Sequence, residues 1–394
     1  MRESVFQVTA SSIFSYFAIG FFILSAQGLS KEPSQDITIG KKVVISSKIL
    51  GEDRPLFISI PQGYHLGGNA YPVLYILDGG GSFLFATSVT DFMARNGLIP
   101  SMIVVAIPNT NRNRDFTPTV EKDRENSGGA PKFLEFMEKE LIPFVENNYH
   151  TQSYRILSGH SLCGMFSIYT MAVKPELFNA TIAMSPYLMY DNETVIETAS
   201  NGIDKKSLNG KSLFITLGNE PNYNASLNRF TKLLKKQTSK EFSWKFERMN
   251  AEGHGSIPLK SLYAGLEFIF DDWKLKGEVF NAGLSAIERH YQNINKKYGY
   301  SIEIPEPILN RLGYQYLQNS NIKEAVKVFM ENVKRYPLSA NVYDSLGEAL
   351  EKQGKSKEAL KNYQKAVELG EKTQSPNLKV FRQNADRLII KKES

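Results

Sequence analysis

Cysteine is nearly absent from this chain of 394 residues, since Cys163 is the only one. The chain can therefore form no intramolecular disulfide, and no cluster of thiolates can hold a zinc ion. The glycine-rich segment "GGGSF", which begins at Gly79, does not have the G-x-G-x-x-G spacing of a dinucleotide-binding loop. We expect neither a metal nor a cofactor.

Basic clusters with interleaved aromatic residues are also lacking. The formal net charge of +6 comes from lysines and arginines spread along the whole chain. The densest basic run, Lys232 to Lys240, contains no aromatic residue on which a nucleobase could stack. We therefore expect no nucleic-acid partner.

Long apolar runs are limited to the amino terminus, where "IFSYFAIGFFIL" covers Ile13 to Leu24. This length is typical of a signal-peptide core and is short for a membrane-spanning helix. Arg2 precedes the run, and Ser25, Ala26, Gln27 and Gly28 follow it. We predict a signal peptide at residues 1–28 and a periplasmic or secreted protein. One alternative is that this segment stays uncleaved as a membrane anchor, and the other is that it forms a buried helix. We expect no other contact with a membrane.

Between residues 36 and 275, short apolar runs alternate with helical patterns, which predicts an α/β domain. The runs "YPVLYIL" and "MIVVAI" are continuously apolar, as in parallel strands that helices cover on both faces. The first two runs, "KKVVISSKIL" and "RPLFISIP", predict an antiparallel pair at the edge of the sheet. The fold class is therefore a mostly parallel sheet with helices on both faces.

Residues 305–372 contain an internal repeat in charged, helical sequence. Gly313 and Gly347 occupy equivalent positions 34 residues apart, and 34 is the tetratricopeptide period. Two repeats are fewer than the three that usually bury a core, so capping helices are expected in the connector at 276–304 and the tail at 373–394. Such repeats can take a protein or peptide partner into their concave face.

The segment "RILSGHSLCGMFSIYTM", Arg155 to Met171, carries the pattern of a catalytic turn. A strand has to stop at Ser158 and a helix has to begin near Leu162, with almost no loop between them. Such a tight turn lifts the hydroxyl of Ser161 clear of the backbone and directs the amino terminus of the helix toward it. We predict that Ser161 is a nucleophile.

One position of this motif departs from the usual G-x-S-x-G. Gly159 satisfies the first glycine, whereas Cys163 stands at the second. Cysteine is small, so we expect the turn to be retained. A cysteine nucleophile would instead place Met165 at a flanking glycine position, where it could hardly fit. The remaining alternative is a strand–helix junction with a serine cap.

The order of residues along the chain selects the partners of Ser161. In α/β-hydrolases an acid and then a histidine follow the nucleophile. Only His254 and His290 follow Ser161, and His290 lies in the charged connector. His254 lies in a glycine-flanked loop and is predicted to be the base. Glu220, at the end of a strand, is favoured as the acid over Asp191, which also follows a strand.

The predicted oxyanion hole consists of two backbone N–H groups. One belongs to Leu162, the residue after the nucleophile, and the other comes from the loop in "YILDGGGSF", from Gly79 or Gly80.

Four further polar residues are candidates for substrate contact. Arg112, Arg114 and Asp115 are expected on a loop at the strand ends, where they could hold an acidic or catecholate group, and His160 adjoins the nucleophile. The alternative for the first three is an Arg–Asp pair that pins the loop.

Seven ordered blocks between residues 40 and 275 resemble the esterase D-like family of α/β-hydrolases. Within it they are similar to ferric siderophore esterases of the enterobactin-, salmochelin- and bacillibactin-hydrolysing kind. The resemblance implies an esterase with Ser161 as nucleophile, His254 as base and an acid in the block that contains Glu220. The blocks are "YPVLYILDGGGSF", "RNRDFTP", "KFLEFMEKELIPFVENNYHT", "RILSGHSLCGMFSIYTM", "LFNATIAMSPYLMYDN", "LFITLGNE" and "GHGSIPLKSLYAGLEFIF".

Two positions depart from the family pattern. Cys163 replaces the elbow glycine, which bears on catalytic efficiency. Met189 and Tyr190 stand where relatives often have tryptophans, which bears on the substrate.

The sequence supports two functional hypotheses. The first is an exported serine esterase that acts on small-molecule esters of the siderophore or the acylated or feruloylated glycan type. The second is a catalytically weak or inactive hydrolase fold that binds a protein through its tetratricopeptide repeats.

Overall fold

The computed structural model describes residues 37–66, 69–204 and 206–393. The predicted signal peptide at residues 1–28 lies outside the described residues. Within the described ranges, no helix combines the length and the hydropathy that a membrane crossing requires.

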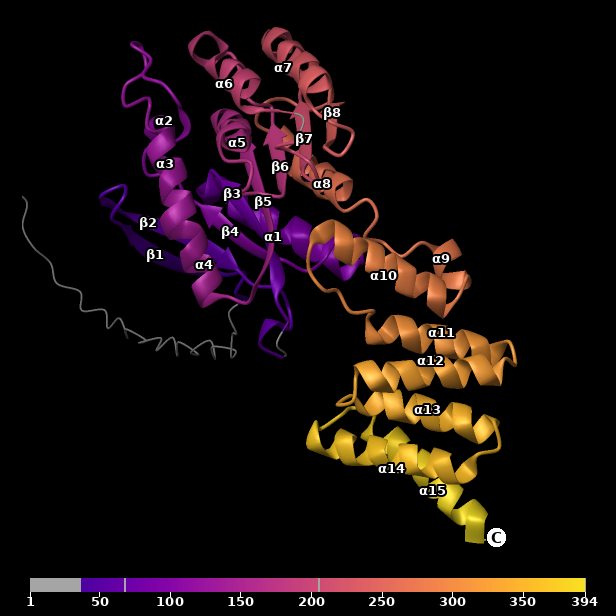
Figure 1. Cartoon of the computed structure of the whole chain (residues 1–394). Helices are drawn as coiled ribbons and strands as arrows, with labels where there is room; N and C mark the ends of the chain where they lie inside the picture. The colour runs from indigo at the N-terminus through magenta and orange to yellow at the C-terminus, as the bar shows by residue number, and fades with distance from the viewer. Residues whose placement is uncertain (1–36, 67–68, 205, 394) are drawn as a thin grey trace, which may run out of the picture. The chain divides into compact units, whose positions relative to one another are not determined.

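Eight strands of the described chain form a single sheet in the order β1-β2-β4-β3-β5-β6-β7-β8 (Figure 1). β1 pairs antiparallel with β2 and β2 pairs antiparallel with β4, whereas the other neighbours are parallel. The antiparallel pair therefore lies at one edge, as the sequence predicts. The strands are β1 (Lys41–Ser47), β2 (Glu52–Ser59), β3 (Tyr71–Leu77), β4 (Ile103–Ile107), β5 (Thr151–His160), β6 (Ala180–Met184), β7 (Ser212–Leu217) and β8 (Ser243–Arg248).

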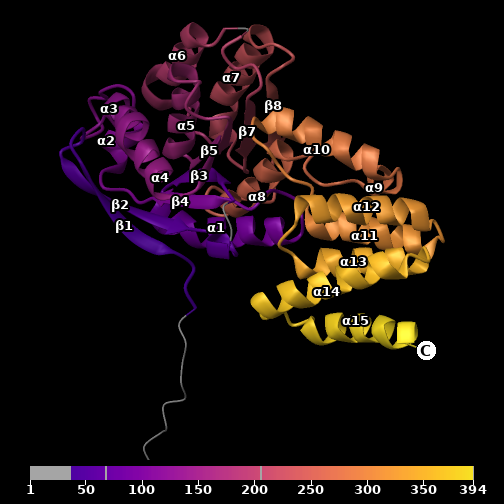
Figure 2. The ribbon, with the colours of Figure 1, turned by 60° about the horizontal axis from the view of Figure 1, so that its bottom comes forward.

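Helices cover both faces of this sheet (Figures 1 and 2). Every residue of β3 is buried, because Tyr75 points into one hydrophobic core and its neighbours Leu74 and Ile76 point into the other. The first core lies under α3 (Ala130–Phe136), α4 (Ile142–Asn148), α5 (Leu162–Val173), α6 (Thr194–Gly202) and α7 (Asn224–Gln237). The second lies under α1 (Gly79–Arg95), α8 (Ile257–Ile269) and α10 (Leu284–Tyr298).

Paired helices follow the sheet domain, and their glycines allow close crossings. A β-carbon at Gly313 would lie 2.5 Å from the ring of Phe329, and one at Gly347 would lie 2.7 Å from the ring of Tyr363. The 34-residue spacing therefore reflects two equivalent helix contacts. The helices of this part are α9 (Gly277–Asn281), α11 (Glu306–Gln318), α12 (Ile322–Arg335), α13 (Ala340–Lys352), α14 (Ser356–Lys372) and α15 (Leu378–Glu393).

The second hydrophobic core continues from the sheet into the first repeat. The buried cluster that contains residues of β3 and α8 also contains residues of three later helices. These are Ile287 and Ile294 of α10, Leu309 and Leu312 of α11, and Val328 of α12. α10 therefore shares a core with both the sheet domain and the repeats.

Candidate active site

Ser161 occupies a sharp turn between β5, which ends at His160, and α5, which begins at Leu162. The strand continues two residues beyond its predicted end at Ser158. Ser161 has a φ of 58°, a left-handed conformation that residues other than glycine rarely adopt. Its amide donates to the carbonyl of Met184 at 2.9 Å, which ties the turn to β6. This is the geometry of a nucleophile elbow.

The glycines around the turn explain how cysteine is accommodated. A β-carbon at Gly159 would overlap the carbonyl of Cys163. A β-carbon at Gly164 would lie 3.0 Å from the carbonyl oxygen of Met184. The close approach to β6 is therefore made one residue later than in G-x-S-x-G, and the side chain of Cys163 is fully buried.

The carboxylate of Glu220 holds the imidazole of His254. Oε1 of Glu220 is hydrogen-bonded to Nδ1 of His254, and Oε2 accepts from the hydroxyl of Ser185 and, at 3.3 Å, from the amide of Gly218. The Glu220 side chain is only 8% exposed, whereas that of His254 is 41% exposed. A carboxylate at Nδ1 favours the tautomer that carries its proton there, which leaves Nε2 free to accept a proton.

The surroundings of His254 place it at the same end of the sheet as Ser161. Its ring lies 4.4 Å, centroid to centroid, from the ring of His160 and 5.7 Å from that of Tyr223. Burial raises the pKa of the Tyr223 phenol, and the nearby Ser161 hydroxyl partly offsets that rise. His160 immediately precedes the nucleophile, so these contacts gather the ends of β5, β7 and β8.

The structure separates the two candidate acids. Asp191 accepts a hydrogen bond of 2.5 Å from the hydroxyl of Thr119. The carboxylate that reaches His254 is that of Glu220.

The predicted oxyanion-hole residues begin two helices that follow neighbouring parallel strands. The glycine segment is not a loop, because α1 begins at Gly79 directly after β3 and Asp78. A β-carbon at Gly79 would lie 2.5 Å from the backbone nitrogen of Ile107, so only glycine fits. N–H groups in the first turn of a helix have no intrahelical acceptor. Gly79, Gly80 and Leu162 lie in such first turns, so their N–H groups are candidates to bind an oxyanion.

Arg112 connects these two helix starts. Its Nε and Nη2 atoms each donate to Asp78 at 2.9 Å, and Nη2 also lies 3.4 Å from the carbonyl oxygen of His160. Asn109 adds a third hydrogen bond to Asp78, at 2.5 Å. Burial opposes ionisation of Asp78, but the Arg112 guanidinium outweighs it and holds the pKa of this carboxyl below its usual value. Two N–H groups of the Arg112 guanidinium are thus occupied by hydrogen bonds to Asp78.

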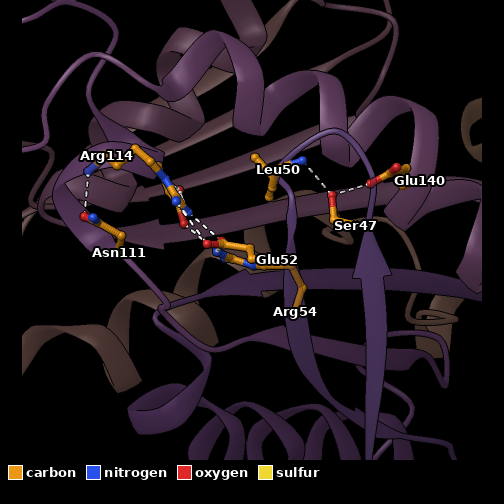
Figure 3. A network of polar contacts seen from close by, with 8 residues as sticks. Ser47, Leu50, Glu52, Arg54, Asn111, Arg114 and Glu140 are labelled. Carbon is orange, nitrogen blue, oxygen red and sulfur yellow. Dashed lines mark hydrogen bonds and ion pairs between the residues drawn. The ribbon is translucent and has the colours of Figure 1, made fainter.

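The structure corrects the assignment of Asp115 to the substrate. Asp115 accepts from Nη1 of Arg54 at 2.7 Å, and neither side chain has exposed surface. Arg114 also donates to Asp115, at 2.8 Å, and to Glu52 of β2. Figure 3 shows Glu52 between Arg54 and Arg114 beside the edge strands. Arg114 and Asp115, in the short helix α2 (Arg112–Phe116), therefore pin this segment to the sheet edge.

His160 is a neutral group beside the candidate base. Burial, followed by the proximity of His254, lowers the pKa of His160 to about 4. Its Nε2 atom is buried and has no hydrogen-bond partner among the described residues.

Several residues of the site were not anticipated from the sequence. Tyr223 packs against His254 and lies near Ser161, and Ser185 donates a hydrogen bond to Glu220. The amide of Tyr187 donates to the carbonyl of Ser161. The ring centre of Tyr187 lies 5.8 Å from that of Tyr223, and the guanidinium of Arg124 lies over the Tyr187 ring. Their positions in the sequence indicate only that Ser185 directly follows β6 and that Tyr223 lies six residues beyond the end of β7.

The sheet order, the elbow at Ser161 and the Glu220–His254 pair define an α/β-hydrolase fold, followed by tetratricopeptide-like helices. The sequence profile of the family described as "Putative esterase" matches residues 47–251, more than half of the chain. The chain therefore belongs to this family. A tetratricopeptide repeat profile matches residues 340–372.

Individual relatives agree with this assignment. The chain is 30% identical over 168 residues to the ferri-bacillibactin esterase BesA of Bacillus subtilis, across 37% of this chain and 58% of the relative. It is 26% identical over 170 residues to the siderophore triacetylfusarinine C esterase of Aspergillus fumigatus, across 39% and 57%. The chain thus spans somewhat more than half the length of these curated relatives.

A solved structure is similar over a longer stretch. The IroE-like serine hydrolase from Shewanella oneidensis superposes with a TM-score of 0.63 at 26% identity, across 75% of this chain and 99% of that one.

Proposed function

We propose that this protein is a serine esterase that hydrolyses carboxylic esters, with siderophore esters as its main substrate class and acylated or feruloylated glycan esters as the second. The observation that carries the proposal is the Glu220–His254 hydrogen bond at the sheet edge that holds Ser161 in a strained elbow, with the His254 ring 4.4 Å from that of the adjacent His160. The names of the relatives BesA and triacetylfusarinine C esterase support the siderophore class.

The chemistry follows the arrangement of these groups. The hydroxyl of Ser161 attacks the ester carbonyl while Nε2 of His254 accepts its proton, and Glu220 stabilises the imidazolium that forms. The amides of Leu162 and of Gly79 or Gly80 bind the oxyanion. His254 then protonates the departing alcohol. Water, deprotonated by His254, releases the acyl group from Ser161.

The wall of the site supports an electron-rich or anionic acyl group. Arg124 lies 5.8 Å from the ring centre of Tyr187 and 5.6 Å from that of Tyr190. Tyr187 and Tyr223 present aromatic surface next to Ser161. A planar aromatic acyl group could stack there and place oxygen atoms near the cation.

We also propose that the enzyme acts in the periplasm or outside the cell, in keeping with the signal peptide predicted at residues 1–28. A membrane anchor formed by an uncleaved segment is the alternative. The repeats are proposed to bind a protein or peptide. An inactive binding module is the less supported reading, because Ser161, His254 and Glu220 are all present.

The test is hydrolysis of an ester panel by the wild type and by Ser161→Ala. The panel contains a ferric catecholate trilactone, a feruloyl sugar, an acetylated xylan fragment and p-nitrophenyl acetate. We expect turnover of the trilactone and a loss of at least about a thousandfold in kcat for Ser161→Ala. Ser345→Ala, which removes a buried hydroxyl in α13, is the matched control and should retain activity.

A fluorophosphonate probe provides an independent measurement. Mass spectrometry should find the label on Ser161 of the wild type. A wild type that cleaves none of the four esters and takes no label would refute the proposal.

A further inference from the structure

The two candidate oxyanion donors come from different segments, and their separation has to be fixed. Gly79 follows Asp78 at the end of β3, and Leu162 follows the elbow at the end of β5. Donors of this kind work only when they are held within about 0.5 Å of the productive geometry. Pairing between the two strands ends at Ile76 and Ser158, so the sheet ladder does not bind the two segments beyond that point.

Side chains connect the two segments where the ladder has ended. The carboxylate of Asp78 receives two hydrogen bonds of 2.9 Å from Arg112. The same guanidinium reaches the elbow, since Nη2 lies 3.4 Å from the carbonyl oxygen of His160 and 4.0 Å from Sγ of Cys163.

Cys163 completes this connection from within the elbow. Its side chain is fully buried, with Sγ 4.0 Å from Nη2 of Arg112 and next to the Asp78 carboxylate. Cys163 stands where the usual elbow has glycine, which has no side chain to offer. The substitution therefore adds a side chain that joins the elbow to the Asp78–Arg112 pair.

We propose that Asp78, Arg112 and Cys163 form a clamp that sets the separation of the oxyanion-binding amides. In this clamp all three are positioning residues, because they act through the backbone of Gly79 and Leu162. The inference rests on the proposed esterase function, and it gives Arg112 a role other than substrate binding.

The test compares Cys163→Ser with Cys163→Ala, two variants of nearly equal size. A serine hydroxyl at this position can donate to Asp78, whereas alanine cannot. We expect Cys163→Ser to stay within about threefold of the wild-type kcat, and Cys163→Ala to lose about tenfold in kcat with KM almost unchanged. Binding of a boronic acid that mimics the tetrahedral intermediate should weaken in the same proportion as kcat.

A double-mutant cycle with Asp78→Asn tests the link itself. If Cys163 acts through Asp78, adding Cys163→Ala to Asp78→Asn should cost less than about twofold more. Thr90→Val is the control, because it removes a buried hydroxyl that bonds the carbonyl of Ala86 within the helix of Gly79. Its kcat should match that of the wild type. If Asp78→Asn does not fold, the comparison of Cys163→Ser with Cys163→Ala still tests whether the clamp exists.

The outcomes separate the two proposals. An active wild type with equal kcat for the serine and alanine variants would overturn the clamp and leave the esterase standing, as would a loss confined to KM. A wild type without esterase activity would overturn both.

Discussion

Replacing Glu220 by glutamine should change the tautomer of His254. Oε2 of Glu220 accepts from Ser185 and from the amide of Gly218, whereas Oε1 faces Nδ1 of His254. The carbonyl oxygen of glutamine has to remain on the side with the two donors, so the NH₂ group turns toward Nδ1. Nδ1 must then accept, the ring proton moves to Nε2, and Nε2 can no longer take the proton of Ser161.

The expected loss in kcat is about 10³- to 10⁴-fold, or roughly 4 to 5.5 kcal/mol in the activation barrier. The kcat should be measured with p-nitrophenyl acetate between pH 6 and 9. The melting temperature of each variant should be measured as well, to show that it is folded. Glu220→Asp, which keeps the charge on a shorter side chain, should lose less.

Asp191→Asn is the matched control for this experiment. Asp191 contacts the hydroxyl of Thr119, which can reverse its role from donor to acceptor. We expect its kcat to remain within about threefold of the wild type. If Asp191→Asn abolished turnover while Glu220→Gln kept more than about a tenth of it, the assignment of the acid would be refuted.

Three further predictions concern stability. His160 has a pKa of about 4 in the fold because of burial, so the unfolded chain binds more protons between about pH 6.5 and 4. The free energy of unfolding should therefore fall by up to roughly 3 kcal/mol, less after solvent screening, as the pH drops from 6.5 to 4. Urea unfolding at pH 7.5 and 5 should show this fall for the wild type and a smaller one for His160→Asn. Asp115→Asn should cost up to about 3–5 kcal/mol, because the buried Arg54 loses its fully buried carboxylate partner and keeps only the partly exposed Glu52; a loss below about 1 kcal/mol in the same assay would contradict this. Gly347→Ala should cost about 1–3 kcal/mol by displacing the ring of Tyr363, lowering the melting temperature while kcat per folded molecule is unchanged.

Patterns that depend on neighbours in the sequence predicted most of the fold. The apolar run of β3 indicated a strand buried on both faces, and all of its residues are buried. The start of α5 at Leu162 follows from the abrupt end of a strand before Ser161. Gly313 and Gly347 indicated close helix crossings because their spacing matches a known repeat.

Features that depend on distant parts of the chain were not predictable. Asp115 is paired with Arg54, which comes 61 residues earlier, and nothing near Asp115 in the sequence indicates that partner. The glycines after Asp78 indicated a loop by their propensity. Tertiary contact overrides that propensity at Gly79, where α1 starts against the backbone of Ile107. Tyr223 reaches Ser161 only because β5 and β7 end at the same edge of the sheet.

The buried layer that α10 shares with the sheet domain and the repeats has a consequence for how the chain can be divided. Tyr298 of α10 packs against Tyr154 and Phe270 with ring-centre distances of 5.3 and 5.2 Å. A shortened protein ending at residue 275 would present both aromatic faces to water and should aggregate. The helices directly after residue 275 are therefore not detachable: α10 and the first repeat complete the second hydrophobic core, so we expect the sheet domain and the first repeat to unfold in one transition.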